Sequence, residues 1–334
     1  MEDLVMENLF NGDKESQIRA ATELGRLKSK QRQYLADRGV IVPLVSMLQS
    51  QDYEAIEAAL FALLSLACGS ERNKRRIVKS GVIPMLLQLL QSQNPLLIEH
   101  TLAAMLILSA CSANKLVIAS SGAVQVLIET LGGDYANDSN MNNISIQAKL
   151  DAIATLHNLS TCHQIVPLIV SSGVVFPLLH LIQGNEKSSE MVEKAIMLLE
   201  NVISLSENAL QETASTGGAI RALVEAIEDG SPQCKEHSAE ILLLICQICR
   251  ETYRGLILRE GVMPGLLQLS VDGTWKAKEI AQNLLLLLRD GSSYCSRSNQ
   301  SKHELIEQVM QEIDAQGDGT TLRLVEDMIA KLST

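Results

Sequence analysis

Cysteine and histidine side chains at close spacing are the first candidates for chemistry in this sequence, because both bind zinc. Cys246 and Cys249 form a C-x-x-C pair, but no second pair stands at zinc-finger distance. The pair lies in the apolar stretch ILLLICQICR, so packing in a helical core is favoured. His157 and His163 flank Cys162 without a fourth ligand. The sequence therefore predicts neither a metal site nor a cofactor.

A second candidate is the segment 314–319, DAQGDG, which resembles the start of a calcium-binding loop between two helices. Calcium in such a loop needs a bidentate carboxylate at position twelve. That position is Val325, Glu326 falls one residue late, and Gln316 occupies position three. A plain helix–turn–helix is the favoured interpretation.

Catalytic motifs give no support for an enzyme. The sequence has no G-x-S-x-G elbow, no G-x-x-x-x-G-K-[ST] phosphate loop and no H-E-x-x-H pair. Carboxylates fall mostly on the expected solvent faces of helices, without a recognisable pairing. We predict that the chain is not an enzyme and has no small-molecule substrate.

The basic run at 72–76, RNKRR, has two interpretations. It can be a nuclear-localisation signal or phosphate-binding patch, or it can be the solvated face of a short helix. The same place in the repeats described below carries a short helix with the pattern N-x-x-x-I-V-x-S-G. The solvated face is therefore favoured.

Composition limits the partners of this 334-residue chain. Hydrophobic residues make up 46% and aromatic residues only 3%, which suits packed helices and leaves few rings for base stacking. The net charge of −11 disfavours nucleic acid. Seven scattered cysteines look like reduced thiols, and neither a signal peptide nor a transmembrane segment is recognised. We expect a soluble protein of the cytoplasm, the nucleus or both.

Internal repeats organise the chain. A glycine precedes the first apolar helix of each unit, with spacings of 42, 41, 51, 45 and 43 residues. These junction glycines are Gly39, Gly81, Gly122, Gly173, Gly218 and Gly261. Periods near 40 to 47 are typical of HEAT and armadillo arrays, and a short helix with two longer ones favours armadillo. The longest spacing contains the Asn- and Gly-rich segment 133–143, which is either a tolerated surface insertion, the favoured interpretation, or a partner-contact loop.

The chain is expected to divide into three parts. Residues 1–290 form the repeat domain, with an atypical first unit, because terminal repeats expose one face to water. Residues 291–300 are a Ser-rich linker. Residues 301–334 carry two amphipathic helices, a hairpin that we expect to cap the end of the repeats.

Several stretches resemble a known family. SGVIPMLLQLLQS, ATLHNLS and GTWKAKEIAQNLLLLLRD are similar to the armadillo (ARM) domains of plant U-box ubiquitin ligases and their relatives without a U-box. The resemblance covers roughly residues 1–290 and implies an all-α, right-handed superhelical solenoid of about seven repeats. It also implies that the long third helices line a concave, protein-binding groove. Nothing here resembles a U-box, so ligase activity is not implied.

The resemblance also assigns groove positions. An Asn within A-L-x-N-L projects into the groove of armadillo proteins, where its amide can hold the backbone of an extended peptide. The matching positions here are Arg26, Ser65, Ile107, Asn158, Asn201, Ile245 and Leu287. One helical turn earlier lie Phe61, Ala103, Ala154, Met197 and Ile241. Only Asn158 and Asn201 keep the asparagine.

The candidate protein-binding groove therefore comprises Asn158, Asn201, Ser65, His157, Phe61 and Met197. Import adaptors carry Trp one turn before the Asn, and Trp275 does not fall there, so a receptor for nuclear-localisation signals is not expected. The apolar groove positions suggest an amphipathic helix or apolar segment as the client, with Asn158 and Asn201 anchoring its middle. Alternatively, neighbouring repeats bury Ile107 and Ile245.

The predicted function is a non-catalytic scaffold or adaptor, monomeric, that binds a segment of a client protein in its groove. The alternative is the substrate-recognition component of a ubiquitin-ligase pathway, working with a separate catalytic chain.

Overall fold

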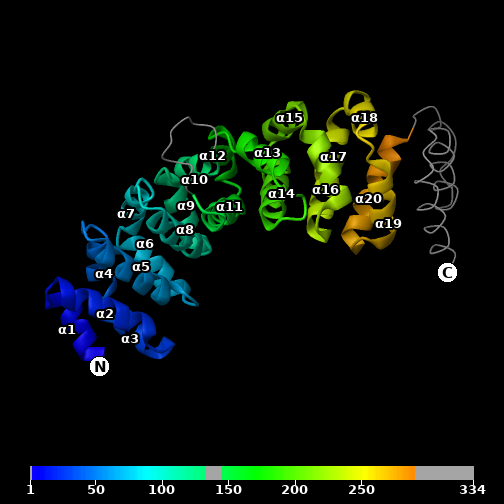
Figure 1. Cartoon of the computed structure of the whole chain (residues 1–334). Helices are drawn as coiled ribbons and strands as arrows, with labels where there is room; N and C mark the ends of the chain where they lie inside the picture. The colour runs from blue at the N-terminus through cyan, green and yellow to red at the C-terminus, as the bar shows by residue number, and fades with distance from the viewer. Residues whose placement is uncertain (1, 133–143, 290–334) are drawn as a thin grey trace. The chain divides into compact units, whose positions relative to one another are not determined.

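A computed structural model describes residues 2–132 and 144–289 (Figure 1). Regular secondary structure in these two ranges consists of α-helices, and neither range contains a strand. The all-α prediction is confirmed. The insertion at 133–143, the linker at 291–300, the hairpin at 301–334 and the calcium-like segment at 314–319 lie outside the described residues.

The helices follow one another in triplets, one triplet to a repeat. In chain order they are α1 (Glu2–Asn11), α2 (Lys14–Arg26) and α3 (Ser29–Asp37); α4 (Ile41–Met47), α5 (Tyr53–Ala67) and α6 (Glu71–Lys79); α7 (Val82–Leu89), α8 (Pro95–Ser109) and α9 (Ser112–Ser120); α10 (Ala123–Gly132), α11 (Ile146–Ser160) and α12 (Val166–Ser171); α13 (Val175–Gly184), α14 (Glu190–Ile203) and α15 (Glu207–Ser215); α16 (Ala219–Asp229), α17 (Pro232–Ile248) and α18 (Arg250–Arg259); and α19 (Met263–Asp272) with α20 (Trp275–Leu288).

Each repeat has one long helix, not the two that the sequence predicted. In the third repeat, for example, the first helix, α7, has only 8 residues, while α8 has 15. Asn94 caps α8, because its Oδ1 accepts the backbone N–H of Leu96 at 3.0 Å. Pro95 then occupies the first helical position, where its missing N–H costs nothing.

The junction glycines carry the turn from one repeat to the next. All of them adopt left-handed backbone conformations, with φ between 77° and 90°. Each glycine follows the last helix of a triplet; for example, the Gly81 N–H donates to the Val78 carbonyl at 3.1 Å. An L-residue with a Cβ avoids this region, whereas glycine does not. The predicted repeat boundaries are confirmed.

Substituting a junction glycine should therefore weaken the fold. Gly122→Ala is expected to lower the free energy of unfolding by about 1–2 kcal/mol, because the new Cβ strains a residue at φ 87°. Gly255 lies inside α18 with open space around it, so Gly255→Ala should raise stability by about 0.5–1 kcal/mol. Urea unfolding followed by circular dichroism measures both variants. Equal shifts of the same sign would contradict the conformational argument.

The chain forms two compact units. Among the residues that the structure describes, unit 1 comprises 2–132, 144–181 and 201–209, and unit 2 comprises 182–200 and 210–289. Within unit 1 the long helices pack in series, α2 on α5, α5 on α8 and α8 on α11. Within unit 2, α17 packs on both α16 and α20. This serial packing of long helices is the armadillo solenoid arrangement.

None of the described helices alone is long and apolar enough to cross a bilayer. The pair α9 and α10 meets the length and composition criteria only when joined, with a bend of 79° between the two helices.

Candidate functional site

The six predicted groove residues lie on the outward faces of long helices. Phe61 and Ser65 belong to α5, His157 and Asn158 to α11, and Met197 and Asn201 to α14. Phe61 is 46% exposed, and the other five are half-buried.

The helical period explains this placement, because the residues that alternate with these positions form the core. Leu156 and Leu159, which flank the α11 pair, are both fully buried. Each outward residue is thus held by a helix whose opposite face is anchored in the repeat stack.

Both predicted asparagines are tied to the preceding repeat. The Nδ2 of Asn158 donates to the Oγ of Ser109 at 3.0 Å, and the Nδ2 of Asn201 donates to the Oγ of Ser160 at 2.5 Å. Each amide also offers a second N–H and a carbonyl oxygen, so one bond leaves donor and acceptor capacity toward a partner. We call these contacts the serine–asparagine links; they fix the orientation of both amides.

Sequence reasoning found the asparagines and missed their serines. Both serines are fully buried, each two residues beyond the asparagine position of its own repeat. The signal was present, because that position carries Ser109 in the repeat before Asn158 and Ser160 in the repeat before Asn201. The pairing would have been found by comparing the asparagine position of one repeat with the position two residues further on in the preceding repeat.

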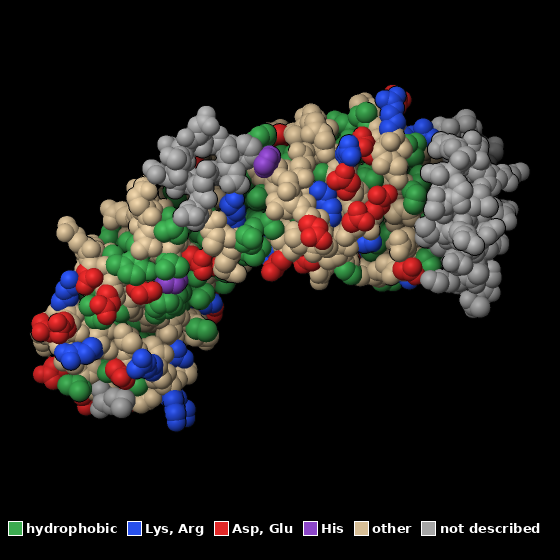
Figure 2. All heavy atoms as spheres, viewed as in Figure 1, with side chains coloured by type: hydrophobic (Ala, Val, Ile, Leu, Met, Phe, Trp, Pro, Cys, Tyr) green, Lys and Arg blue, Asp and Glu red, His purple; other side chains and the backbone are tan. Residues whose placement is uncertain are grey.

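An aromatic contact marks the same face nearer the N-terminus of unit 1. The rings of Phe61 on α5 and His100 on α8 lie with centroids 4.7 Å apart and planes tilted by 57°. Glu57, one turn before Phe61, approaches the His100 Nδ1 at 3.7 Å. Figure 2 shows hydrophobic side chains gathered over α5 and α8. This part of the face is apolar with a polar edge, the composition of a protein contact.

Two groove positions considered in unit 2 lie in the core, which confirms the alternative that Ile245 is buried, whereas Met197 and Leu287 of the same unit are half-buried. Ile241 and Ile245 are fully buried in α17, and the half-buried residues at the equivalent places are Glu240 and Leu244. The A-L-x-N-L pattern that defines these positions is absent from α17, so its sequence does not fix which residues face outward. Burial in the structure does. Ile107 in unit 1, by contrast, stays half-buried on its face.

The outward face of unit 2 is charged where an apolar floor was predicted. Glu200 contacts the Nδ1 of His237, and Lys276 lies 3.7 Å from Glu236 and 3.8 Å from Glu200. Burial raises the pKa of Glu240, and the nearby Glu200 and Glu236 carboxylates raise it further against the opposing charge of Lys276. Figure 2 shows acidic and basic side chains interspersed over α16–α20.

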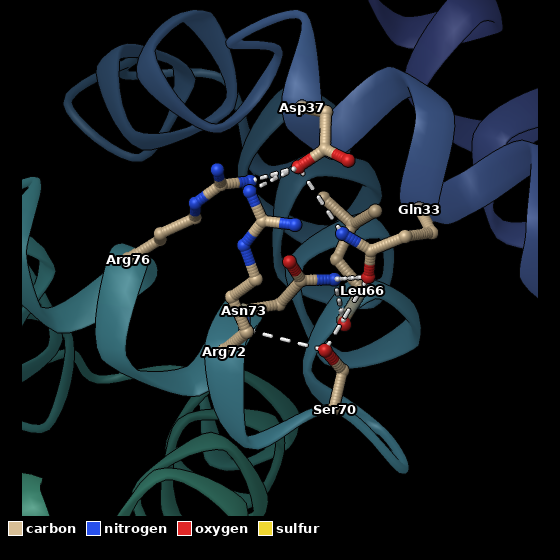
Figure 3. Close-up of polar contacts among 7 residues, drawn as sticks. All are labelled: Gln33, Asp37, Leu66, Ser70, Arg72, Asn73 and Arg76. Carbon is tan, nitrogen blue, oxygen red and sulfur yellow. Dashed lines mark hydrogen bonds and ion pairs between the residues drawn. The ribbon is translucent and has the colours of Figure 1, made fainter.

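The basic run at 72–76 is tied to the preceding repeat (Figure 3). Arg72 and Arg76 both pair with the Oδ1 of Asp37 at the end of α3, at 3.2 and 2.5 Å. The hydrogen bond from Arg76 holds the pKa of Asp37 below its ordinary value, with further lowering by the charge of Arg72. Lys74 pairs with Glu71 at 2.6 Å. The run is a surface helix face with local counter-charges, as favoured from the sequence.

Comparison with known proteins settles the family. Residues 136–313 match the family model of the plant U-box protein ARM repeat region, and residues 70–110, which contain α6 to α8, match the armadillo/beta-catenin-like repeat. The chain belongs to the plant U-box ARM repeat family. Both matching models describe repeats rather than a U-box. The resemblance predicted from the sequence is confirmed.

Two Arabidopsis thaliana relatives illustrate the extent of the match. U-box domain-containing protein 45 is 32% identical over 186 residues, covering 55% of this chain and 22% of the relative. U-box domain-containing protein 17 is 28% identical over 299 residues, covering 88% of this chain and 39% of the relative. The ARM chain thus spans well under half the length of either protein.

Solved structures support the solenoid fold. An engineered protein superposes with a TM-score of 0.70 at 20% identity, covering 99% of this chain and 78% of that one. A designed armadillo repeat protein in complex with the peptide (KR)4 superposes with a TM-score of 0.51 at 17% identity, covering 85% of this chain and 98% of that one. At these identities the likeness concerns the fold.

The remaining sequence candidates are elements of this ARM fold. Cys246 is fully buried in α17, where burial raises the pKa of its thiol, so the core-packing interpretation is confirmed for it. Cys249 lies at the C-terminal end of α17, with its Sγ 3.0 Å from the Thr252 hydroxyl. Trp275 opens α20 and is 80% exposed, away from the repeat core.

A buried carboxylate in the ARM core gives a pH-dependent prediction. Burial raises the pKa of Asp151 above its ordinary value of 3.8, the Glu99 charge adds to this, and a hydrogen bond from Gln147 opposes it. Its contribution to stability is present at low pH and is lost as pH rises through the raised pKa. Asp151→Asn should therefore raise the melting temperature at pH 7, with a gain that fades below pH 4.

Asp13 supplies the opposite control. Its exposed carboxylate accepts the Ser16 N–H at 2.9 Å, and hydrogen bonding to Ser16 lowers its pKa. Its contribution is present at neutral pH and is lost as pH falls through the lowered pKa, so any cost of Asp13→Asn should shrink in acid. Melting curves from pH 3 to 8 distinguish the two. Parallel curves for Asp151→Asn and the unmodified chain would refute the argument.

Proposed function

We propose that the outward faces of the long helices bind an extended or helical segment of a client protein, and that the chain acts as a non-catalytic adaptor. The serine–asparagine links carry this proposal. They hold two half-buried amides in fixed orientations, one repeat apart, on a face that also presents Phe61. Oriented amides suit peptide backbone, because an asparagine side chain donates and accepts at once.

The solved armadillo designs add support of a general kind. One is described as made for modular peptide recognition, and another was solved with a peptide bound. We propose that this chain likewise binds a peptide segment. It would do so as a monomer in the cytoplasm or nucleus, compartments that keep cysteines reduced.

A photo-crosslinking experiment tests the adaptor role. A benzophenone amino acid at Ser65 captures clients in plant extract, and mass spectrometry identifies the crosslinked segments. A purified client is then titrated against the unmodified chain, Asn158→Ala/Asn201→Ala and the control Asn8→Ala/Asn208→Ala. We expect the first double variant to weaken binding at least about tenfold, as for loss of two hydrogen bonds, and the control to bind normally. Equal affinity of all three proteins would refute the anchoring role.

A second candidate follows from the names of the relatives. The matched Arabidopsis proteins are U-box domain-containing proteins, so we propose as the alternative that the repeats select substrates in a ubiquitin pathway. Reconstituted ubiquitination tests this idea with the crosslinked client, E1, E2 and a separate U-box chain. Client ubiquitination that requires the ARM chain would favour the alternative. Chain formation by the ARM chain and E2 alone would overturn the non-catalytic assignment.

A further inference from the structure

A polar cavity of about 340 Å³ opens in unit 1, where the start of α3 meets the end of α5 and the start of α6. Its volume lies in the range of ligand pockets. Lys30 and Arg32 of α3 supply two cations to its lining, and no carboxylate is among the described lining residues. Ser65, a predicted groove residue, forms part of the same wall.

Arg32 is a cation without a counter-charge. Its Nε is buried without a hydrogen-bond partner, and its side chain makes no ion pair among the residues that the structure describes. Nearby Arg72 and Arg76 are instead both paired with Asp37. A buried guanidinium N–H without a partner costs free energy, which a bound acceptor would recover.

Asn73 supplies an unmatched acceptor on the same lining. It is only 2% exposed, and its Nδ2 donates to the Leu66 carbonyl at 2.9 Å and to the Gln33 Oε1 at 3.2 Å. Its Oδ1 is buried with no partner. Ser70 donates to the same Gln33 oxygen at 3.4 Å, so a hydrogen-bonded network holds this wall (Figure 3).

Two helix starts add positive potential to the cavity. Lys30 and Arg32 lie in the first turn of α3, and Ser70 caps α6 by accepting the Asn73 N–H at 3.3 Å. Helix N-termini carry a partial positive charge. Cations, helix starts and an unsatisfied guanidinium N–H all favour an oxyanion, for which arginine is the preferred partner.

We propose that this cavity is an anion-binding subsite that takes the carboxylate or phosphoryl group of a client side chain. Arg32 and Lys30 bind the oxyanion, and the hydrogen-bonded network through Asn73, Gln33 and Ser70 holds the wall beside it. The proposal rests on the proposed function, because Ser65 joins the cavity to the face that binds the client. It specifies the client further: an acidic or phosphorylated residue stands at one end of the bound segment.

The test uses short peptides, so it requires no identified client. The full-length ¹⁵N-labelled chain is titrated with acetyl-AEDEA-amide, a phosphoserine peptide, inorganic phosphate and the uncharged acetyl-AQNQA-amide. We expect one or both anionic peptides to shift the amide resonances of Arg32 and Asn73. The neutral peptide should leave them in place. Which anionic peptide binds more tightly identifies the oxyanion.

Matched variants distinguish binding in the pocket from non-specific attraction between the peptide and surface cations. Arg32→Gln should weaken anionic-peptide binding at least tenfold, Arg32→Lys less, and the paired control Arg72→Gln less than twofold. Asn158→Ala/Asn201→Ala should leave peptide binding intact. A failure of the pocket proposal can therefore be distinguished from a failure of the proposed client-binding face. Equal losses in Arg32→Gln and Arg72→Gln would overturn the proposal. So would equal binding of the neutral peptide, or response to inorganic phosphate alone.

Discussion

Leu86→Ala is expected to lower the free energy of unfolding by about 3–5 kcal/mol. Leu86 is fully buried in α7 and contacts a small apolar cavity of about 10 Å³, which Leu63 of α5 and Leu108 of α8 also line. Surrounding side chains have not closed this space, so the void left by alanine should persist. Urea unfolding followed by circular dichroism measures the loss.

Leu96→Ala is the matched control. Leu96 lies in the first turn of α8 and is 57% exposed, so the same substitution should change stability by less than about 0.5 kcal/mol. A loss for Leu86→Ala no larger than that of the control would show that the junction between the second and third repeats contributes little. A broadened unfolding transition would indicate that neighbouring repeats have become uncoupled.

Asn114→Ala should cost about 2–3 kcal/mol, because it removes two hydrogen bonds donated by one buried amide. Asn114 of α9 is 2% exposed, and its Nδ2 donates to the Leu108 carbonyl at 3.0 Å and to the Lys74 carbonyl at 3.2 Å. One amide thus satisfies the end of α8 and ties α9 to α6 of the preceding repeat.

Asn94→Ala provides the comparison for this prediction. Asn94 also caps α8, but at its exposed N-terminal end, where removal of a capping side chain typically costs about 1 kcal/mol. Chemical denaturation of the two variants under one set of conditions ranks the sites. Equal losses would mean that the burial of the Asn114 contacts adds nothing.

Local conformational preference is the part of the fold that the sequence predicted best. A left-handed residue after a helix is specified by glycine itself, so Gly81 and Gly122 marked true boundaries without any knowledge of packing. Helix lengths were predicted less well from the sequence. The start of α8 is set by the Asn94 cap and Pro95, and the sequence had predicted no cap at Asn94.

Contacts between repeats were the part that was not predicted. Asp37 pairs with Arg76 across 39 residues, and Asn158 meets Ser109 across 49. Each partner is an ordinary surface or helix residue by local criteria, and only stacking of the triplets brings the two together. Burial of Ile245 has the same origin, since the packing of α17 on α16 and α20, and not its local sequence, decides which side of the helix is buried.

The serine–asparagine links also have a polarity. Ser109 and Ser160, which receive the amide N–H groups, in turn donate to the carbonyls of Leu106 and His157. Hydrogen bonds that run in one sense strengthen one another, so donation at nitrogen makes the amide oxygen a better acceptor. Both asparagines should therefore prefer backbone N–H groups over carbonyls. Two acceptors held one repeat apart would therefore select backbone N–H groups at a fixed spacing on a bound chain.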